Sequence, residues 1–181
     1  AYGCNKLQAG LGNLVSAIKY FRNNMVDLRI ALVSAITAMT GAWIGTKIIF
    51  LLPEESIQKA ITVALPVIAL IMVLRKTDAR NVIMRSEISK KTVVQALIVG
   101  VIMGFYNSLF GPGIGTVAII AFTMIMHYDA RCASGNGKVL IVLTNAIALV
   151  SYVKTGNVAY EIACPAAICA IAGNLVGVNL A

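Results

Sequence analysis

Residues 30–52 read IALVSAITAMTGAWIGTKIIFLL, a run of 23 residues in which Lys47 is the one charged side chain. A helix of this length rises about 34 Å, enough to cross the roughly 30 Å hydrocarbon core of a bilayer. Four other stretches qualify wholly or in part, namely residues 4–21, 58–74, 93–128 and 139–181, the last holding two crossings. The sequence therefore predicts an all-α polytopic membrane protein.

The composition and the distribution of charge agree with this class. Apolar residues make up 59% of the 181 residues and charged residues 12%, with a mean hydropathy of +0.87. A soluble domain needs more charge to cover its surface. The net charge of +8 gathers largely in the polar connection at 75–91, which carries Arg75, Lys76, Arg80, Arg85, Lys90 and Lys91. Such loops mark the cytoplasmic side, so we expect a multi-pass membrane protein, surrounded by lipid and without a nucleic-acid partner.

The chain repeats itself at an offset of 132 residues. The alignment needs no gap over residues 1–49 and pairs Gly3 with Gly135, Lys6 with Lys138, Asn13 with Asn145, Tyr20 with Tyr152, and Gly41 and Gly45 with Gly173 and Gly177. These paired glycines predict small-residue faces for close helix packing. We therefore expect two homologous halves, residues 1–75 and 92–181, joined by a basic cytoplasmic linker at 76–91. The repeat also predicts an intact protein of about 250 residues, with segments before Ala1 and after Ala181 that complete the halves.

The relative orientation of the halves depends on residues 116–128, which span only about 20 Å as a helix. If this segment crosses the membrane, the halves are inverted; if it is re-entrant, they run parallel. The connection at 19–29 carries Lys19, Arg22 and Arg29, whereas its repeat partner carries only Lys154. This charge asymmetry favours an inverted repeat with broken or re-entrant helices.

Two lysines stand at matching places in the halves, each at the expected start of an apolar helix. Glycine, asparagine and small polar residues precede both, a pattern typical of a helix N-terminus, where free N–H groups attract anions. A charge at membrane depth is costly and is a functional hypothesis by default. We predict substrate contacts from Asn5, Lys6, Asn136 and Lys138. The alternative is that both lysines reach the headgroups.

A second candidate feature is the stretch GFYNSLFGPGIG at 104–115. Its closely spaced glycines and proline cannot continue a regular helix. A break inside the membrane exposes backbone groups that can hold a substrate. The predicted contacts are Asn107, Ser108, Gly111, Pro112, Gly113 and Gly115. The alternative is a tight turn outside the membrane.

Asn13 and Asn145, two turns further along the lysine helices, either line the pathway or join helices by hydrogen bonds. Cysteines and the single His127 show no metal-ligand spacing, and no Ser/His/Asp or paired-carboxylate constellation is present. We therefore expect no enzymatic activity, no cofactor and no metal.

The string GCNKLQ at 3–8, followed by Tyr20-Phe21-Arg22 and Val26-Asp27, resembles the first-half motif of the TauE/SafE sulfite exporter family. That family is also described as the toluenesulfonate uptake permeases. Residues 104–115 are similar to its second-half motif, and residues 133–138 to the second copy of its lysine motif. The resemblance covers essentially the whole chain. It implies an inner-membrane carrier of sulfur-containing or organic anions such as sulfite, sulfoacetate or other sulfonates.

The chain departs from the family pattern within the candidate site. Asn107-Ser108 stands where the family often has Asp-Gly, and Cys4 stands where it often has Thr. The leading interpretation is a secondary transporter that moves a small anion by alternating access around a midplane site. A passive anion channel and a non-transporting membrane accessory subunit are the alternatives. The sequence leaves a homodimer open and does not identify the direction of transport or the coupling ion.

Overall fold

The computed structural model describes residues 2–53, 89–111, 113–156 and 158–180, with scattered residues between 55 and 70. The described part contains six helices and no strand: α1 (Tyr2–Arg22), α2 (Leu28–Leu51), α4 (Lys90–Leu109), α5 (Ile114–Met124), α6 (Ala130–Lys154) and α7 (Tyr160–Leu180). The predicted all-α class is confirmed. Most of the expected span at 58–74, most of the linker at 76–91, and Pro112 lie outside the described residues.

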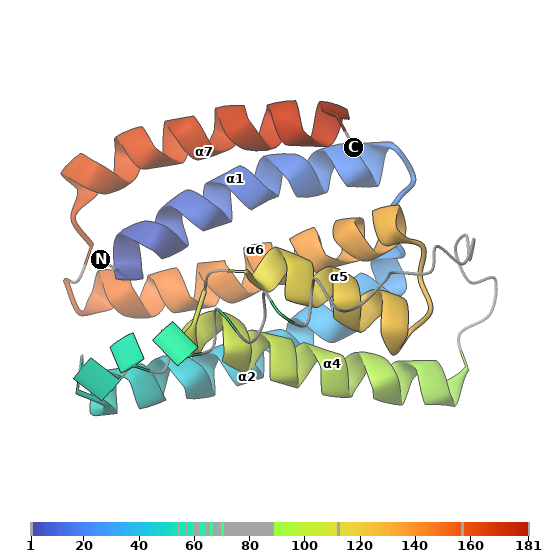
Figure 1. The fold of residues 1–181 in the computed structure, drawn as a ribbon, viewed down its shortest axis with the longest axis horizontal. Helices are drawn as coiled ribbons and strands as arrows, with labels where there is room; N and C mark the ends of the chain where they lie inside the picture. Colours follow the sequence, from blue (N-terminus) through green and yellow to red (C-terminus); the bar gives the residue numbers. More distant parts are fainter. Residues whose placement is uncertain are drawn as a thin grey trace.

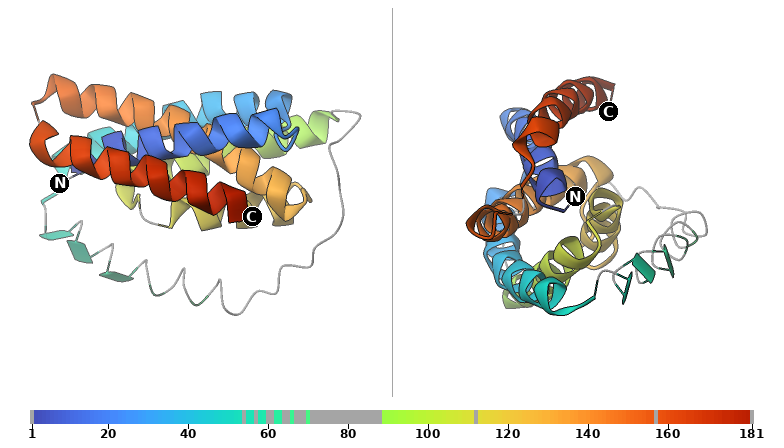
Figure 2. Two further views of the ribbon diagram at one scale, coloured as in Figure 1. Left: turned by 90° about the horizontal axis from the view of Figure 1, so that it is seen from above. Right: turned by 90° about the vertical axis from the view of Figure 1, so that its left-hand side faces the viewer.

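The helices run along the long axis of the molecule (Figure 1). Helix α6 is central, because it contacts α1, α2, α4 and α5. Helix α1 packs against both α6 and α7, and α2 packs along α4 (Figure 2). Helices α1 and α6 run in opposite directions, as do α2 and α7 (Figure 1). The inverted orientation of the halves stays a prediction, which these opposed directions support.

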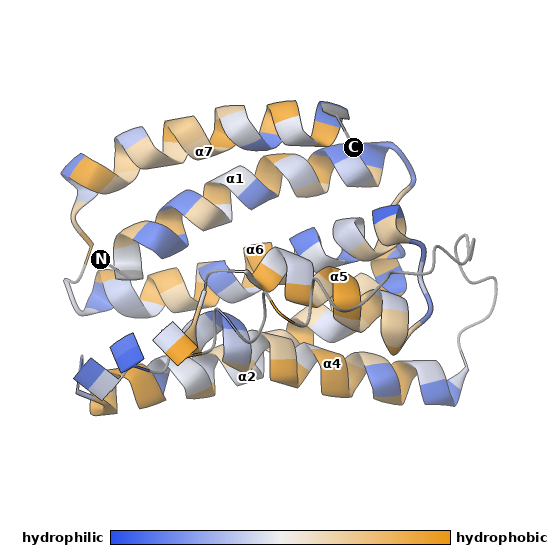
Figure 3. Cartoon of the chain, viewed as in Figure 1, coloured by the Kyte–Doolittle hydropathy of each residue, from blue (hydrophilic) through white to orange (hydrophobic). Residues whose placement is uncertain are grey.

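Four helices, α2, α4, α6 and α7, are long and apolar enough to cross a membrane. Hydrophobic residues are frequent along these helices (Figure 3), and the exposed apolar side chains include Ile36, Trp43, Ile102, Ile162 and Ile168. A multi-pass membrane protein is thereby confirmed. Helix α1 has 21 residues but does not reach the same hydropathy. Its polar side chains, Lys6 and Ser16 among them, are buried against neighbouring helices.

The basic residues of the described part gather at one end of the bundle. Helix α1 ends there, and α2, α4 and α6 begin there, on the right of Figure 1. This end therefore carries Lys19, Arg22, Arg29, Lys90, Lys91 and Arg131. Lys47 and Lys154 lie toward the opposite end, where α2 and α6 finish. This distribution of basic residues supports a cytoplasmic location for the end of the bundle that carries these six side chains.

Glycines set the close packing of α2 on α4. A Cβ atom added to Gly104 would overlap the carbonyl group of Ala38, and one added to Gly41 would overlap the carbonyl oxygen of Val101. The predicted close approach at Gly41 and Gly45 is confirmed, since Gly45 lies against Ser108 and Phe105 in the same way.

The corresponding prediction for Gly173 and Gly177 is wrong within the described part of the chain. A Cβ atom added to either glycine would meet no described atom within 4 Å. Helix α7 packs on α1 through a different face, which includes Ala170 and Asn174 against Gly12.

The predicted interruption at 104–115 is confirmed. Helix α4 ends at Leu109, Gly111 and Gly113 have φ of 69° and 78°, and α5 begins at Ile114. The left-handed backbone at these two positions favours glycine. The backbone N–H groups of Thr116 and Val117 both bond to the carbonyl of Gly113, at 3.1 Å, which starts α5. Since α5 has only 11 residues, whether it is re-entrant stays a prediction.

Glycine packing yields a paired test of the fold. We expect Gly104→Ala to lower the free energy of unfolding by about 1–3 kcal/mol, because the new methyl group forces α2 and α4 apart. The matched control Gly173→Ala adds its methyl group in open space inside α7, so it should not destabilise the protein and should raise the free energy of unfolding by up to about 1 kcal/mol through helix propensity. Thermal unfolding of the purified protein in detergent measures both changes. Equal losses in the two variants would contradict the described packing.

Candidate functional site

The side chain of Lys6, near the start of α1, is buried against α4. It lies on α1, is only 2% exposed, and is among the largest fully buried side chains of the described residues. Its Nζ donates to the backbone oxygen of Asn107 and to the Oδ1 of Asn107, the latter at 3.5 Å. The alternative in which Lys6 reaches the headgroups therefore does not hold.

Asn107 joins three helices around this lysine. It stands in the last turn of α4, just before the break, and is 2% exposed. The oxygens of Asn107 accept hydrogen bonds from Lys6. Its Nδ2 donates to Thr144 Oγ1 at 2.7 Å and to Asn145 Oδ1 at 2.9 Å, both on α6. One amide side chain thus holds α1, α4 and α6 together at the level of the break.

The glycine-rich break also comes close to Lys6. A Cβ atom added to Gly111 would lie 3.2 Å from Asn5 Nδ2 and 3.7 Å from Lys6 Nζ. The backbone at Gly111 therefore packs closely on both donors, and a side chain at this position would crowd Asn5. The structure brings together five of the predicted residues here: Asn5, Lys6, Asn107, Gly111 and Asn145.

Other residues of the predicted set face elsewhere. The Ser108 hydroxyl donates to the carbonyl of Ala42 at 2.8 Å, so it points to α2 rather than to Lys6. Gly113 is exposed, and a Cβ atom there would lie 3.9 Å from the Tyr106 hydroxyl. Pro112 lies outside the described residues.

Asn136 is buried, but the structure does not place it with the lysines. Its Oδ1 accepts from the backbone N–H of Asp27 at 2.9 Å, and Asp27 also accepts from the Tyr128 hydroxyl at 2.7 Å. Residues two apart on a helix face different directions, which separates Asn136 from Lys138. The prediction that these two side chains form one site is therefore not met.

The prediction that Lys138 stands at a helix N-terminus is wrong. Helix α6 begins at Ala130, where the Asp129 carboxylate accepts from the backbone N–H of Arg131 at 3.1 Å. Lys138 therefore lies more than two turns inside the helix. The neighbouring glycines serve packing, because a Cβ atom at Gly135 would overlap the carbonyl oxygen of Met25.

Lys138 forms a second polar cluster with α1 and α7. It is half-buried, and its Nζ donates to Asn13 Oδ1 at 2.7 Å and to Asn174 Oδ1 at 3.4 Å. Asn174 also accepts from the Ser16 hydroxyl at 2.8 Å. Asn174 was absent from the predicted set, because its repeat partner is Ala42 and the alignment therefore did not mark it. An amide in an otherwise apolar run was the available signal.

A hollow of about 230 Å³ opens beside Lys138, between α5 and α6. Its polar lining comes from Lys138, Ser134, Thr116 and the predicted residue Gly115. A smaller hollow of about 150 Å³ lies between α1 and α6, lined by Lys6 and Asn145 and otherwise mainly by aliphatic side chains.

The two lysines are arranged reciprocally across the predicted repeat. Lys138 bonds directly to Asn13, and Lys6 reaches Asn145 through the amide of Asn107. The lysine of the second half thus bonds to the asparagine of the first half, and the lysine of the first half connects to the asparagine of the second. Seven residues separate lysine and asparagine on each helix, so the two clusters lie about 10 Å apart along the helix axes.

None of the described hydrogen-bond partners of Lys6 and Lys138 is a carboxylate. The described acidic residues, Asp27, Glu55, Asp129 and Glu161, all lie at helix ends or in the scattered segment after α2. The Nδ2 of Asn145 is buried without an acceptor in the described part of the chain. Cationic and amide donors thus outnumber acceptors near Lys6, which favours an anionic ligand.

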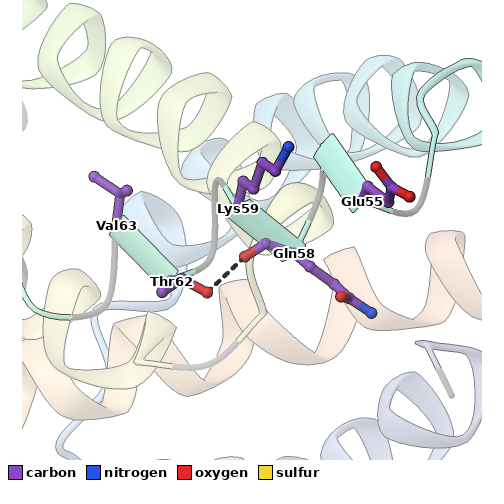
Figure 4. A pocket seen from close by; sticks show the side chains of 5 residues that line it. All are labelled: Glu55, Gln58, Lys59, Thr62 and Val63. Carbon is purple, nitrogen blue, oxygen red and sulfur yellow. Dashed lines mark hydrogen bonds between the residues drawn. The ribbon is translucent and has the colours of Figure 1, made fainter.

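A third hollow, of about 380 Å³, lies on the segment that follows α2 (Figure 4). Its lining consists of Glu55, Gln58, Lys59, Thr62 and Val63. All five side chains are exposed, and Thr62 Oγ1 donates to the carbonyl of Gln58 at 2.8 Å. With no buried polar group in its lining, this hollow is not a candidate site.

Residues 1–181 match the sequence profile of the family described as sulfite exporter TauE/SafE. The chain belongs to the TauE/SafE family. The resemblance drawn from the lysine and glycine motifs is thereby confirmed, and the protein is a member of a membrane transporter family.

Curated relatives of this TauE/SafE chain carry transporter names. It is 24% identical to a probable membrane transporter protein of Haemophilus influenzae, over 99% of this chain and 68% of the relative. It is 26% identical to the probable membrane transporter protein ORF9 of a Sinorhizobium species, over 88% of this chain and 60% of that protein. It is 23% identical to the probable membrane transporter protein YfcA of Escherichia coli K12, over 87% of this chain and 58% of that protein. The matched regions thus span 58–68% of the length of these relatives, and no solved structure matches.

The polar network around Asn107 yields a stability prediction. We expect Asn107→Ala to lower the free energy of unfolding by about 2–5 kcal/mol, because it strips buried partners from Lys6, Thr144 and Asn145. Asn23→Ala, at an exposed turn, is the matched control and should change stability by less than about 0.5 kcal/mol. Chemical or thermal unfolding in detergent measures both. A neutral Asn107→Ala variant would show that this amide does not join the three helices.

Proposed function

We propose that this TauE/SafE protein is a secondary carrier of small sulfur-containing or organic anions, of the sulfite, sulfonate or sulfoacetate type. The observation that carries the proposal is the buried Lys6, which lies beside the Gly111 break without a carboxylate partner in the described residues. A buried ammonium is stabilised when an anion enters beside it. We propose that the transported substrate is this anion.

The surroundings of the two lysines suit an oxyanion. Near Lys6, the amide nitrogens of Asn5 and Asn145 are further donors. Near Lys138, the hydroxyls of Ser134 and Thr116 line a hollow whose volume, about 230 Å³, suits a small organic anion rather than a bulky one. Hydrogen bonds from ionised donors to oxyanions are roughly twice as strong as neutral ones, so few donors suffice.

The same geometry supports alternating access. The two lysine clusters occupy matching places on the antiparallel helices α1 and α6 (Figure 1), but Lys6 is enclosed while Lys138 is half-buried and borders a hollow. In an inverted repeat, exchange of the two conformations moves the open hollow from one side to the other. We propose that transport uses this exchange, with the anion passing between the Lys138 and Lys6 clusters.

Transport in proteoliposomes tests this function. We expect the intact protein to take up a sulfonate or sulfite, and the double variant Lys6→Ala, Lys138→Ala to lose at least about tenfold in initial rate. Each lost charged hydrogen bond is worth about 1.5–3 kcal/mol, which accounts for a loss of this size. The matched control removes two lysines at helix ends, Lys19→Ala and Lys154→Ala, and should retain uptake.

The other outcomes are informative. Undiminished uptake by the Lys6→Ala, Lys138→Ala variant would refute the site. Uptake that equilibrates the anion but never concentrates it under any ion gradient would indicate a channel. If the purified intact protein moved no anion of this class, an accessory role would replace the carrier.

A further inference from the structure

We propose that Lys6 carries a proton together with the anion, so that each transport cycle moves one proton and one anion in the same direction. This inference rests on the proposed carrier function and adds its coupling ion. The anion site in question is the hollow of about 150 Å³ between α1 and α6, which Lys6 and Asn145 line.

The hydrogen bonds of Lys6 fit two protonation states. A neutral amine has two N–H groups, and Asn107 offers two acceptors, its backbone oxygen and its Oδ1. An ammonium has a third N–H group, for which no described residue is an acceptor. Both N–H groups of a neutral amine are therefore accepted by Asn107, and the third N–H group of an ammonium is accepted once an anion is present.

The energetics of burial couple these two ligands. An unpaired charge that is only 2% exposed costs several kcal/mol relative to water. An anion beside Lys6 removes much of this cost, and a proton on Lys6 removes much of the cost of burying the anion. By linkage, each ligand raises the affinity for the other by the same factor.

Unused donors show where the anion would sit. The Nδ2 of Asn145 is buried and has no acceptor in the described part of the chain, although its Oδ1 is bonded to Asn107. The Nδ2 of Asn5 also lies near Lys6, because a Cβ atom added to Gly111 would be 3.2 Å from Asn5 Nδ2 and 3.7 Å from Lys6 Nζ. An oxyanion in the hollow that Lys6 and Asn145 line would satisfy Asn145 and the third N–H of Lys6, because it offers several acceptors.

Other titratable groups on the surrounding helices are less suited to carry this proton. The set comprises Cys4, Lys19, Tyr20 and Arg22 on α1, Lys90, Lys91 and Tyr106 on α4, Arg131, Cys132, Lys138, Tyr152 and Lys154 on α6, and Tyr160, Glu161, Cys164 and Cys169 on α7. Glu161 is the one carboxylate among them, and it is exposed in the first turn of α7. Lys138 borders the larger hollow, where water can solvate its ammonium. Lys6 is the enclosed cation of the set.

The experiment uses the intact protein in proteoliposomes that contain an entrapped pH dye, with radiolabelled methanesulfonate as the probe. Methanesulfonate keeps its charge at all working pH values, so any proton that accompanies it is carried by the protein. We expect one proton to enter per methanesulfonate. We also expect a gradient of one pH unit to drive about tenfold accumulation, since one proton moved through one pH unit supplies about 1.4 kcal/mol.

Variants assign the coupling to Lys6. Lys6→Arg keeps a permanent cation at this place, so residual methanesulfonate uptake should lose its proton and no longer respond to the pH gradient. The control Glu161→Gln should retain both uptake and the ratio of one proton per anion. Lys138→Arg should retain that ratio in whatever uptake remains.

The outcomes separate this inference from the carrier function. Methanesulfonate uptake by the unaltered protein without proton entry would overturn the proton coupling and leave the carrier intact. Proton entry that persists in Lys6→Arg, or is lost in Glu161→Gln, would overturn the assignment to Lys6. If the unaltered protein transported neither methanesulfonate nor sulfite nor sulfoacetate, the carrier function itself would fail.

Discussion

The contact between the buried Lys6 amine and Asn107 determines how the polar interior of this bundle is organised. A lysine that is 2% exposed in an apolar setting needs acceptors, and the last turn of α4 supplies them from one residue. Because the amide of Asn107 is also bonded to Thr144 and Asn145, the lysine, the helix break and α6 form one unit. No described carboxylate lies in this unit to balance the positive charge of the lysine. This unbalanced charge is the basis for proposing an anionic substrate.

Helix packing makes this arrangement possible. Gly100 and Gly104 of α4 pack against the backbone of α2, and Gly111 lies close to Lys6 and Asn5. Small residues thus let the helices and the break approach one another closely. Ser16, a second buried polar side chain of α1, donates to Asn174 of α7. The polar interior is therefore shared among helices along which hydrophobic residues are frequent (Figure 3).

The sequence predicted much of this site because charged and amide residues are rare in apolar runs. Lys6, Lys138, Asn13 and Asn145 were marked by the repeat, and Asn107 by the break that follows it. Asn174 and Thr144 were missed, since single polar residues in a helix do not reveal which neighbour they meet. The glycines before Lys138 were misread as a helix start. A glycine required by close packing and one required by a positive φ look the same in a sequence, and Gly135 is of the first kind while Gly111 is of the second.

A crystal structure of the intact protein with bromomethanesulfonate tests the central claim most directly, because the bromine marks the ligand by its anomalous scattering. The account predicts an anomalous peak in the hollow between α1 and α6, with sulfonate oxygens within hydrogen-bonding distance of Lys6 Nζ and Asn145 Nδ2. A Lys6→Gln variant should lose this peak under the same conditions. A peak remote from both lysine clusters, or one that persists in the Lys6→Gln variant, would contradict the account.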